Sequence, residues 1–229
     1  MISLISQRVA EGIGSAIVTG EYPEGSTLPS EAALCDRYGA SRTAVREALK
    51  MLGGKHLVRA RPRLGGSVMH RAAWSILDSD VLRWMRDAPP DLALLEELAV
   101  LRLAIEPEAA AAAARARNPV ALAALKDAMV RMTSDPGDAL AADVAFHVAL
   151  LEASGNRFFA GLSGMVESAL SMSIPVTNAV KRVPKADVEA HRAVFLAIAG
   201  GRAEEAHARA QALIAETLRL LREVRTAQP

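Results

Sequence analysis

Only two residues, Gly39 and Ala40, separate two short helical patterns in the N-terminal part of the chain. The first pattern begins after Ser30 and the second after Ser41, and a serine there can accept a hydrogen bond from the first helical turn. Glu31 lies in the first turn of the earlier helix, where the helix dipole favours an acid. Because a connection this short makes the two helices cross steeply, the segment is predicted to be a helix-turn-helix.

The elements on either side of this pair predict a larger domain. A preceding helix that ends near Gly20 is indicated by apolar residues that recur every four positions, namely Ile5, Val9, Ile13 and Ile17. Two short, partly β-branched runs follow at 56–60 and 67–70, and the sequence RPRLGG between them suits the tip of a hairpin. Three helices followed by a hairpin make a winged helix, which we expect to span residues 1–73.

The rest of the chain predicts helices alone. Residues 74–90 are expected to form a linker helix that docks by its apolar side and ends at Pro89 and Pro90. Residues 91–229 are expected to form an all-α bundle of about six helices. Their predicted ranges are 91–117 with a bend near Pro107, 119–133, 138–154, 156–174, 186–200 and 202–225. The predicted fold class is therefore mainly α, with an N-terminal winged helix-turn-helix domain and a C-terminal helical bundle.

Composition narrows the class of protein. The 229 residues suit one large domain or two of ordinary size. The lone Cys35 excludes an internal disulfide framework and suits a reducing cytoplasm. No apolar run reaches the roughly 18 residues of a membrane helix, and the amphipathic N-terminus does not resemble a signal peptide. We therefore expect a cytoplasmic protein with no membrane segment.

The net charge of +1 conceals an uneven distribution along the chain. Residues 1–75 carry ten Lys or Arg against six Asp or Glu, whereas residues 76–229 carry seventeen against twenty. Between Arg37 and Arg71 there are nine cations and a single acid, Glu47. A basic patch on one part of a nearly neutral protein indicates a polyanionic partner for that part.

The helix that follows Ser41 places cations along one face. That face carries Arg42, Thr43, Arg46 and Lys50, and the opposite face carries Val45, Ala48, Leu49 and Leu52. The simpler interpretation is a solvated cationic surface. However, further cations follow in the hairpin, at Arg59, Arg61 and Arg63. A helix of this size fits the major groove of DNA, and the hairpin arginines would lie against the backbone or minor groove.

The stretch LPSEAALCDRYGASRTAVREALKMLGGKHLVRARPRLGGSVM resembles the winged-helix domain of the GntR family of bacterial transcription regulators. Charge pattern and resemblance together predict operator contacts at Ser30, Glu31, Ser41, Arg42, Thr43, Arg46, Lys50, Arg61, Arg63, Gly65 and Gly66. Two positions differ from the usual family pattern. Ala32 replaces an Arg that often contacts DNA, and His56 replaces a Gly. The operator sequence is therefore expected to differ from the commonest family pattern.

The C-terminal half contains a candidate metal-binding pair. Asp143 and His147 lie four residues apart and share one face of a predicted helix. Such a pair can hold a divalent metal if other helices add ligands, or it can form a hydrogen bond of purely structural value. His191 is a second candidate, although a single His on an amphipathic helix is more often structural.

The stretches DVAFHVALLEASGN and EAHRAVFLAIAGG are similar to the effector-binding domain of the FadR-type branch of GntR regulators. The resemblance implies that Asp143, His147 and His191 hold a divalent metal such as Zn, Ni or Mn, which helps to bind a small carboxylate. Leu213 stands where the family usually has a last His, and His207 comes too early to replace it. Alternatively, the three residues hydrogen-bond the effector directly.

Arg102 matches an arginine in the first helix of the family's effector domain. It would pair with both oxygens of an effector carboxylate. The alternative is a surface ion pair with Glu106, one helical turn later, worth a few tenths of a kcal/mol.

The segment AAWSILDSDVLRWM resembles the linker of regulators of sugar-acid catabolism, particularly those of the galactonate operon. We therefore expect a homodimeric repressor, not an enzyme, that binds operator DNA and responds to an aldonate. Three alternatives stay open. These are a regulator that responds to another small carboxylate, a metal-dependent enzyme acting on such a carboxylate, and an architectural protein that binds DNA without sequence preference.

Overall fold

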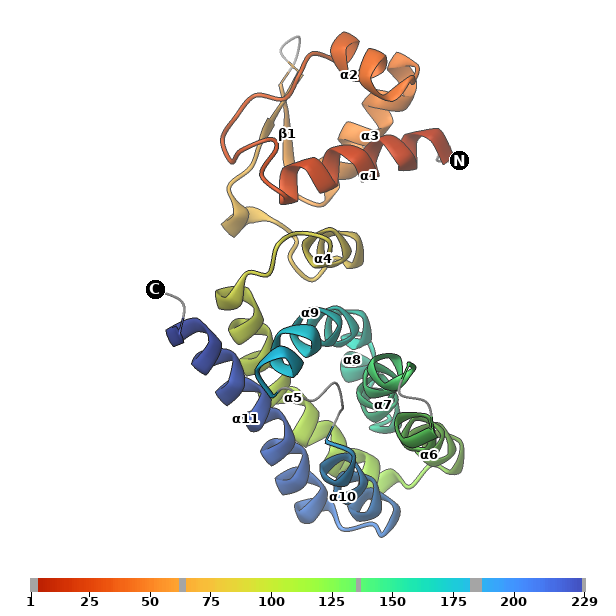
Figure 1. The fold of residues 1–229 in the computed structure, drawn as a ribbon. Helices are drawn as coiled ribbons and strands as arrows, with labels where there is room; N and C mark the ends of the chain where they lie inside the picture. Colours follow the sequence, from red (N-terminus) through yellow and green to blue (C-terminus); the bar gives the residue numbers. More distant parts are fainter. Residues whose placement is uncertain (1–3, 62–64, 135–136, 182–186, 228–229) are drawn as a thin grey trace. The chain divides into compact units, whose positions relative to one another are not determined.

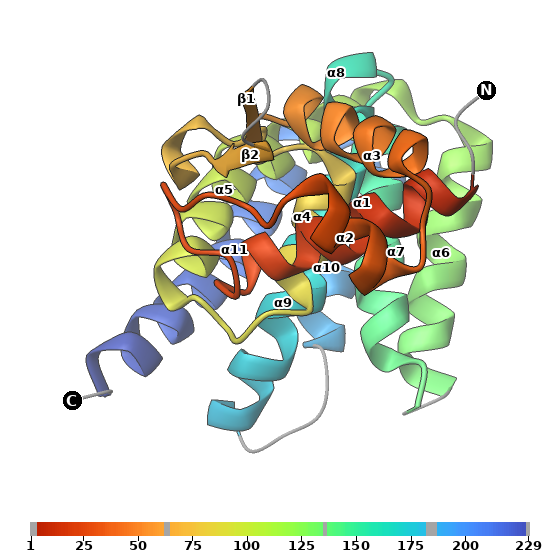
Figure 2. The ribbon, with the colours of Figure 1, turned by 90° about the horizontal axis from the view of Figure 1, so that it is seen from above.

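The computed structural model describes residues 4–61, 65–134, 137–181 and 187–227, and only the backbone of residues 60, 61, 65 and 181. The chain divides into two compact units, Met1–Pro89 and Pro90–Pro229. Figures 1 and 2 show the helices and strands of each unit. The breaks expected at Pro136 and Pro184 lie outside the described residues.

The first unit is a winged helix-turn-helix, as predicted. Its elements are α1 (Leu4–Val18), α2 (Glu31–Tyr38), α3 (Arg42–Gly54), β1 (Val58–Arg61) and β2 (Gly65–Val68). Ser30 and Ser41 accept hydrogen bonds from Ala33 N and Ala44 N, and Gly39 ends α2 in the left-handed conformation. The strands pair antiparallel, with Val58 opposite Val68.

The core of this unit forms where α1 and α3 pack together. The contributing side chains, each at most 4% exposed, are Val9, Ile13 and Ile17 of α1, Val45, Ala48 and Leu52 of α3, Leu34 of α2, and Leu57, Val58 and Val68 around the hairpin. Since the apolar face of α3 is turned inward, its cationic face is left to the solvent.

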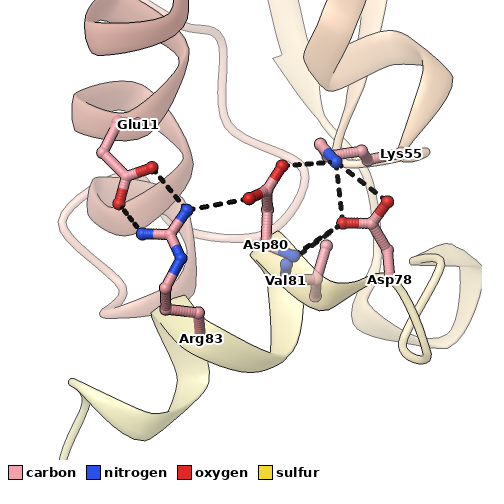
Figure 3. Close-up of polar contacts among 6 residues, drawn as sticks. All are labelled: Glu11, Lys55, Asp78, Asp80, Val81 and Arg83. Atoms are coloured by element: carbon pink, nitrogen blue, oxygen red, sulfur yellow. Dashed lines mark hydrogen bonds and ion pairs between the residues drawn. The ribbon is translucent and has the colours of Figure 1, made fainter. Parts of the chain in front are cut away.

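The expected linker helix is much shorter than predicted. Residues 71–73 form a 3₁₀ turn, and α4 spans only Ser79–Arg86. The prediction failed because Asp78 starts the helix late, since its carboxylate accepts hydrogen bonds from Asp80 N and Val81 N (Figure 3). Leu77, an apolar residue of the segment expected to dock by its apolar side, is 52% exposed.

Helix α4 packs on α1 as part of the first unit. The ring of Trp84 lies so close to Gly14 that a Cβ atom there would come within 2.4 Å of it. A chain of ion pairs also links α4 to the rest of this unit (Figure 3). Arg83 bonds to Glu11 of α1 and to Asp80 at 2.8 Å, and Lys55 Nζ lies 2.8 Å from Asp80 Oδ2. Both apolar and polar contacts therefore fix α4 to its own unit.

The second unit is an all-α bundle. Its helices are α5 (Leu92–Ala116), α6 (Pro119–Ser134), α7 (Ala139–Ala153), α8 (Arg157–Ala160), α9 (Ser163–Lys181), α10 (Val188–Ala199) and α11 (Ala203–Ala227). The single helix expected over 156–174 was wrong, because Asn156 caps a short α8 and a break at Gly161 precedes α9. Helix α9 also continues through Pro175.

Helices α5 and α11 pack along each other, and α6, α7, α9 and α10 complete the bundle (Figure 1). The alanines at 109–111, 113 and 114 are at most 5% exposed, so small side chains let the helices approach closely. Phe146, Leu150 and Val194 fill the space beside them.

Candidate functional site

The cationic face of α3 is exposed, as its spacing predicted. Arg42, Thr43, Arg46 and Lys50 are all exposed, whereas on the opposite face Val45, Ala48 and Leu52 are buried and Leu49 is partly buried. Arg46 Nε donates to Glu31 Oε2 at 2.9 Å, and Lys50 Nζ donates to Glu47 at 2.8 Å. Among the described residues, Arg42 has no ion pair within 4.0 Å. Exposed pairs of this kind are weak, so phosphates can replace the carboxylates.

The wing is described only in part. The backbone of Arg61 lies in β1, but its side chain and the whole of Arg63 fall outside the described residues. Gly65 and Gly66 lie in β2, and a Cβ at Gly66 would come within 2.5 Å of Val58 Cγ1. Packing within the hairpin therefore favours glycine at position 66, independently of any contact with DNA.

The second unit contains a cavity of about 200 Å³. Its lining includes Arg102, Asp143, His147 and His191 of the predicted site. Sequence reasoning missed the other polar lining residues, which are Thr177, Asn178, Asp187, Arg209, Glu216 and Thr217. Leu213 also lines the cavity, whereas His207 lies elsewhere, 3.3 Å from Glu108.

Asp143, His147 and His191 converge at this cavity, each at most 6% exposed. Asp143 Oδ1 lies 3.4 Å from His147 Nε2 and 3.5 Å from His191 Nε2. The two Nε2 atoms are 3.3 Å apart. In a tetrahedral zinc site with bonds of about 2.1 Å, neighbouring ligand atoms lie about 3.4 Å apart. The group therefore has the spacing to hold a metal ion.

The protonation of the two imidazoles strengthens this conclusion. His147 Nδ1 lies 2.5 Å from Glu106 Oε2, and His191 Nδ1 lies 2.7 Å from the carbonyl oxygen of Asp187. Both partners are acceptors, so each Nδ1 carries the proton and donates. The Nε2 lone pairs of the neutral rings then face each other and the Asp143 carboxylate. Such a cluster of electron pairs needs a metal ion or a proton at its centre.

The surroundings of these groups shift their pKa values. Burial opposes ionisation of Glu106, but the charge of Arg102 and the hydrogen bonds from Arg102 and His147 outweigh it and hold the pKa of Glu106 at about 2. Burial lowers the pKa of His147. Burial also opposes protonation of His191, but its bond to Asp143 outweighs this and raises the pKa of His191. Of the two imidazoles, His191 therefore holds a proton more strongly than His147 does.

Arg102 is not the surface residue of the simpler interpretation. Its side chain is 2% exposed and that of Glu106 is fully buried, with Arg102 Nε donating to Glu106 Oε1 at 2.5 Å. Sequence reasoning considered Glu106 only as a surface partner. The spacing of four residues from Arg102 was the available signal that the two share a face.

Comparison with known proteins identifies both units. Residues 5–68 match the model for bacterial regulatory proteins of the gntR family, and residues 97–216 match the FCD domain. The chain is 30% identical to the galactonate operon transcriptional repressor of Escherichia coli, over 96% of this chain and 97% of that protein. The chain belongs to the GntR family.

Two further proteins are similar to the chain over nearly its whole length. The chain is 32% identical to YieP of Escherichia coli, an uncharacterized HTH-type transcriptional regulator, over 92% of both chains. A solved structure of Lar, which controls the Listeria monocytogenes agr system, superposes with a TM-score of 0.63 at 17% identity, covering 98% of this chain and 99% of that chain.

Membership of the GntR family makes the protein a DNA-binding transcription regulator with an FCD effector domain. The matched proteins are regulators, which are not enzymes. Among the described helices, none combines the length and apolar character needed to cross a membrane.

Proposed function

We propose that the protein is a cytoplasmic, homodimeric repressor of a sugar-acid catabolic operon, released from its operator by an aldonate of the galactonate type. Helix α3 and the wing bind one half of a near-palindromic operator, and two-fold symmetry supplies the other half. The similarity to the galactonate operon repressor along nearly the whole chain supports this choice of effector class.

The single observation that carries the proposal is the buried group of Asp143, His147 and His191 at the cavity. These three residues would hold a divalent metal, with Zn, Ni and Mn as candidates. A bound divalent cation supplies positive charge and open positions for carboxylate and hydroxyl oxygens. The protein contributes three of the ligands and excludes bulk water.

The rest of the cavity suits a polyhydroxy acid. Thr177 and Asn178 of α9 and Thr217 of α11 offer hydroxyl and amide groups that can bond to sugar hydroxyls. Leu213 adds an apolar wall on α11. Ten of the sixteen residues that line the cavity are polar or charged, which suits a ligand with a carboxylate and several hydroxyl groups.

Repression is relieved only if the effector binds one arrangement of the DNA-binding units more tightly than another. Calorimetry tests this function. Galactonate and related aldonates are titrated into the wild type and His147→Ala, each with and without Zn²⁺, Ni²⁺ or Mn²⁺, while operator binding is followed by fluorescence anisotropy. We expect one aldonate to bind the metal-loaded wild type, weaken its operator binding, and bind His147→Ala poorly.

The sugar-acid assignment is wrong if no aldonate binds the metal-loaded wild type. The pocket lies elsewhere if His147→Ala binds the active aldonate as tightly as the wild type does. Sedimentation at micromolar concentration tests the dimer, and a monomer both with and without operator DNA would contradict it.

A further inference from the structure

Glu106 joins two helices at the floor of the effector cavity. It lies on α5, is fully buried, and touches two other buried side chains. One carboxylate oxygen accepts from Arg102 Nε at 2.5 Å, and the other lies 2.5 Å from His147 Nδ1 on α7. Glu106 therefore contacts a candidate metal ligand on the side away from Asp143 and His191.

This contact determines which ring nitrogen of His147 carries the proton and which keeps its lone pair. An ionised carboxylate only accepts hydrogen bonds, so Nδ1 must carry the proton. Arg102 Nη2 lies 3.3 Å from the same Nδ1, but both atoms are then donors and both point to the carboxylate. The lone pair of His147 is consequently left on Nε2, which faces Asp143 Oδ1 at 3.4 Å.

Glu106 also cancels the positive charge that Arg102 could otherwise offer to an anionic ligand. The positive charge of Arg102 is neutralised by a fully buried partner. Asp143, also buried, adds a negative charge at the same cavity. Arg209, Asp187 and Glu216 also line the cavity, so these groups together carry two positive and four negative charges while both imidazoles are neutral. A carboxylate ligand therefore gains little from entering the site without metal.

We propose that Glu106 is the positioning residue of the effector site. It fixes His147 with Nε2 toward the metal position, and it occupies Arg102 so that metal, rather than Arg102, supplies the charge that attracts an anionic effector. This inference rests on the proposed metal-assisted effector site. It assigns Arg102 to the support of His147 rather than to the first contact with the ligand.

The tautomer is measured in the metal-free wild type by long-range ¹H–¹⁵N NMR of the histidine rings, assigned with His191→Gln. We expect His147 to carry its proton on Nδ1. A proton on Nε2 would overturn the proposal, and this measurement needs no substitution of Glu106.

Metal affinity is then compared among variants by calorimetry with Zn²⁺ and Mn²⁺. Glu106→Gln should bind about 10–100-fold more weakly than the wild type, the usual loss when the partner of a ligating His is removed. Glu108→Gln is the matched control, because Glu108 lies on the same helix but bonds to His207 away from the cavity. It should bind metal as the wild type does.

A double variant covers the case in which Glu106→Gln fails to fold. Arg102→Met with Glu106→Leu removes both buried charges, a change that proteins often tolerate. It should show the same loss of metal affinity. If a folded Glu106 variant binds metal as tightly as the wild type, the positioning role is wrong. A wild type that binds neither metal overturns the metal site instead, and the ring spectrum still decides whether Glu106 sets the tautomer.

Discussion

At the scale of single residues, His56 stands where the family pattern usually has Gly, and its backbone is strained there. Its backbone has φ 58°, in the left-handed region that favours glycine. Its ring nitrogen Nδ1 lies 2.9 Å from Ser75 Oγ, which partly offsets the strain. An L-residue in this conformation costs about 1–2 kcal/mol, so a residue without this strain at position 56 would stabilise the folded state.

We expect His56→Gly to raise the free energy of unfolding by about 1 kcal/mol, because relief of the backbone strain exceeds the lost bond to Ser75. Denaturant unfolding followed by tryptophan fluorescence checks this, since both tryptophans, Trp74 and Trp84, lie in the first unit. His70→Gly is the control, because His70 has φ −62° and gains nothing from glycine. Equal effects of the two substitutions would contradict the expectation.

Leu213 permits a gain-of-function test at the cavity. We expect Leu213→His to bind Zn²⁺ more tightly than the wild type, because zinc prefers four protein or water ligands and position 213 lines the cavity. Leu213→Gln, which is polar but a poor zinc ligand, serves as the control. Calorimetry with Zn²⁺ measures the difference, and an unchanged affinity would mean that position 213 does not reach the three ligands.

At the scale of elements, α4 depends on charges that acid removes. The hydrogen bond from Arg83 lowers the pKa of Glu11, although burial opposes it. Burial raises the pKa of Asp80, but bonds from Lys55 and Arg83 outweigh it and lower that pKa overall. Both groups therefore stabilise the folded state above their ordinary pKa values of 4.5 and 3.8, and this stability is lost as pH falls through their lowered values.

We therefore expect α4 to loosen from α1 as the pH is lowered below about 4. In a Trp74→Phe background, the emission of Trp84 should shift to the red over this range, because its ring is 2% exposed against Gly14. Glu11→Gln should show part of the shift already at neutral pH. An emission spectrum that stays constant until the whole protein unfolds would contradict a separate loosening of α4.

Local signals predicted the elements that local chemistry determines. Ser30, Ser41 and Gly39 stand where caps were expected, because capping depends on neighbours in the sequence. The start of α4 was missed because the pattern of apolar residues outweighed the capping signal of Asp78. The role of Glu106 could not be predicted, since its contact with His147 joins two residues that lie 41 positions apart in the sequence. Only resemblance placed Arg102 and His191 near Asp143.

At the scale of the whole molecule, operator binding should depend on the cations of α3. We expect Arg46→Ala to cost about 1–3 kcal/mol if it reads a base, and affinity to fall steeply with salt as counterions are released. Arg42→Ala combined with Arg46→Ala should abolish specific binding. Arg192→Ala, which removes an exposed cation from α10, is the control. Fluorescence anisotropy with operator DNA measures both, and operator binding unchanged in the double variant would refute this surface.

Helix α11 connects the cavity with the start of α5. One stretch of it, at Leu213 and Thr217, lines the cavity, and another, at Arg225, lies 2.9 Å from Glu96 near the start of α5. The thirteen residues from Leu213 to Arg225 span about 18 Å of continuous helix. A helix is stiff along its axis. If a ligand shifts α11 at the cavity, the end of α11 that contacts Glu96 therefore shifts with it, close to the point where α5 begins after Pro90.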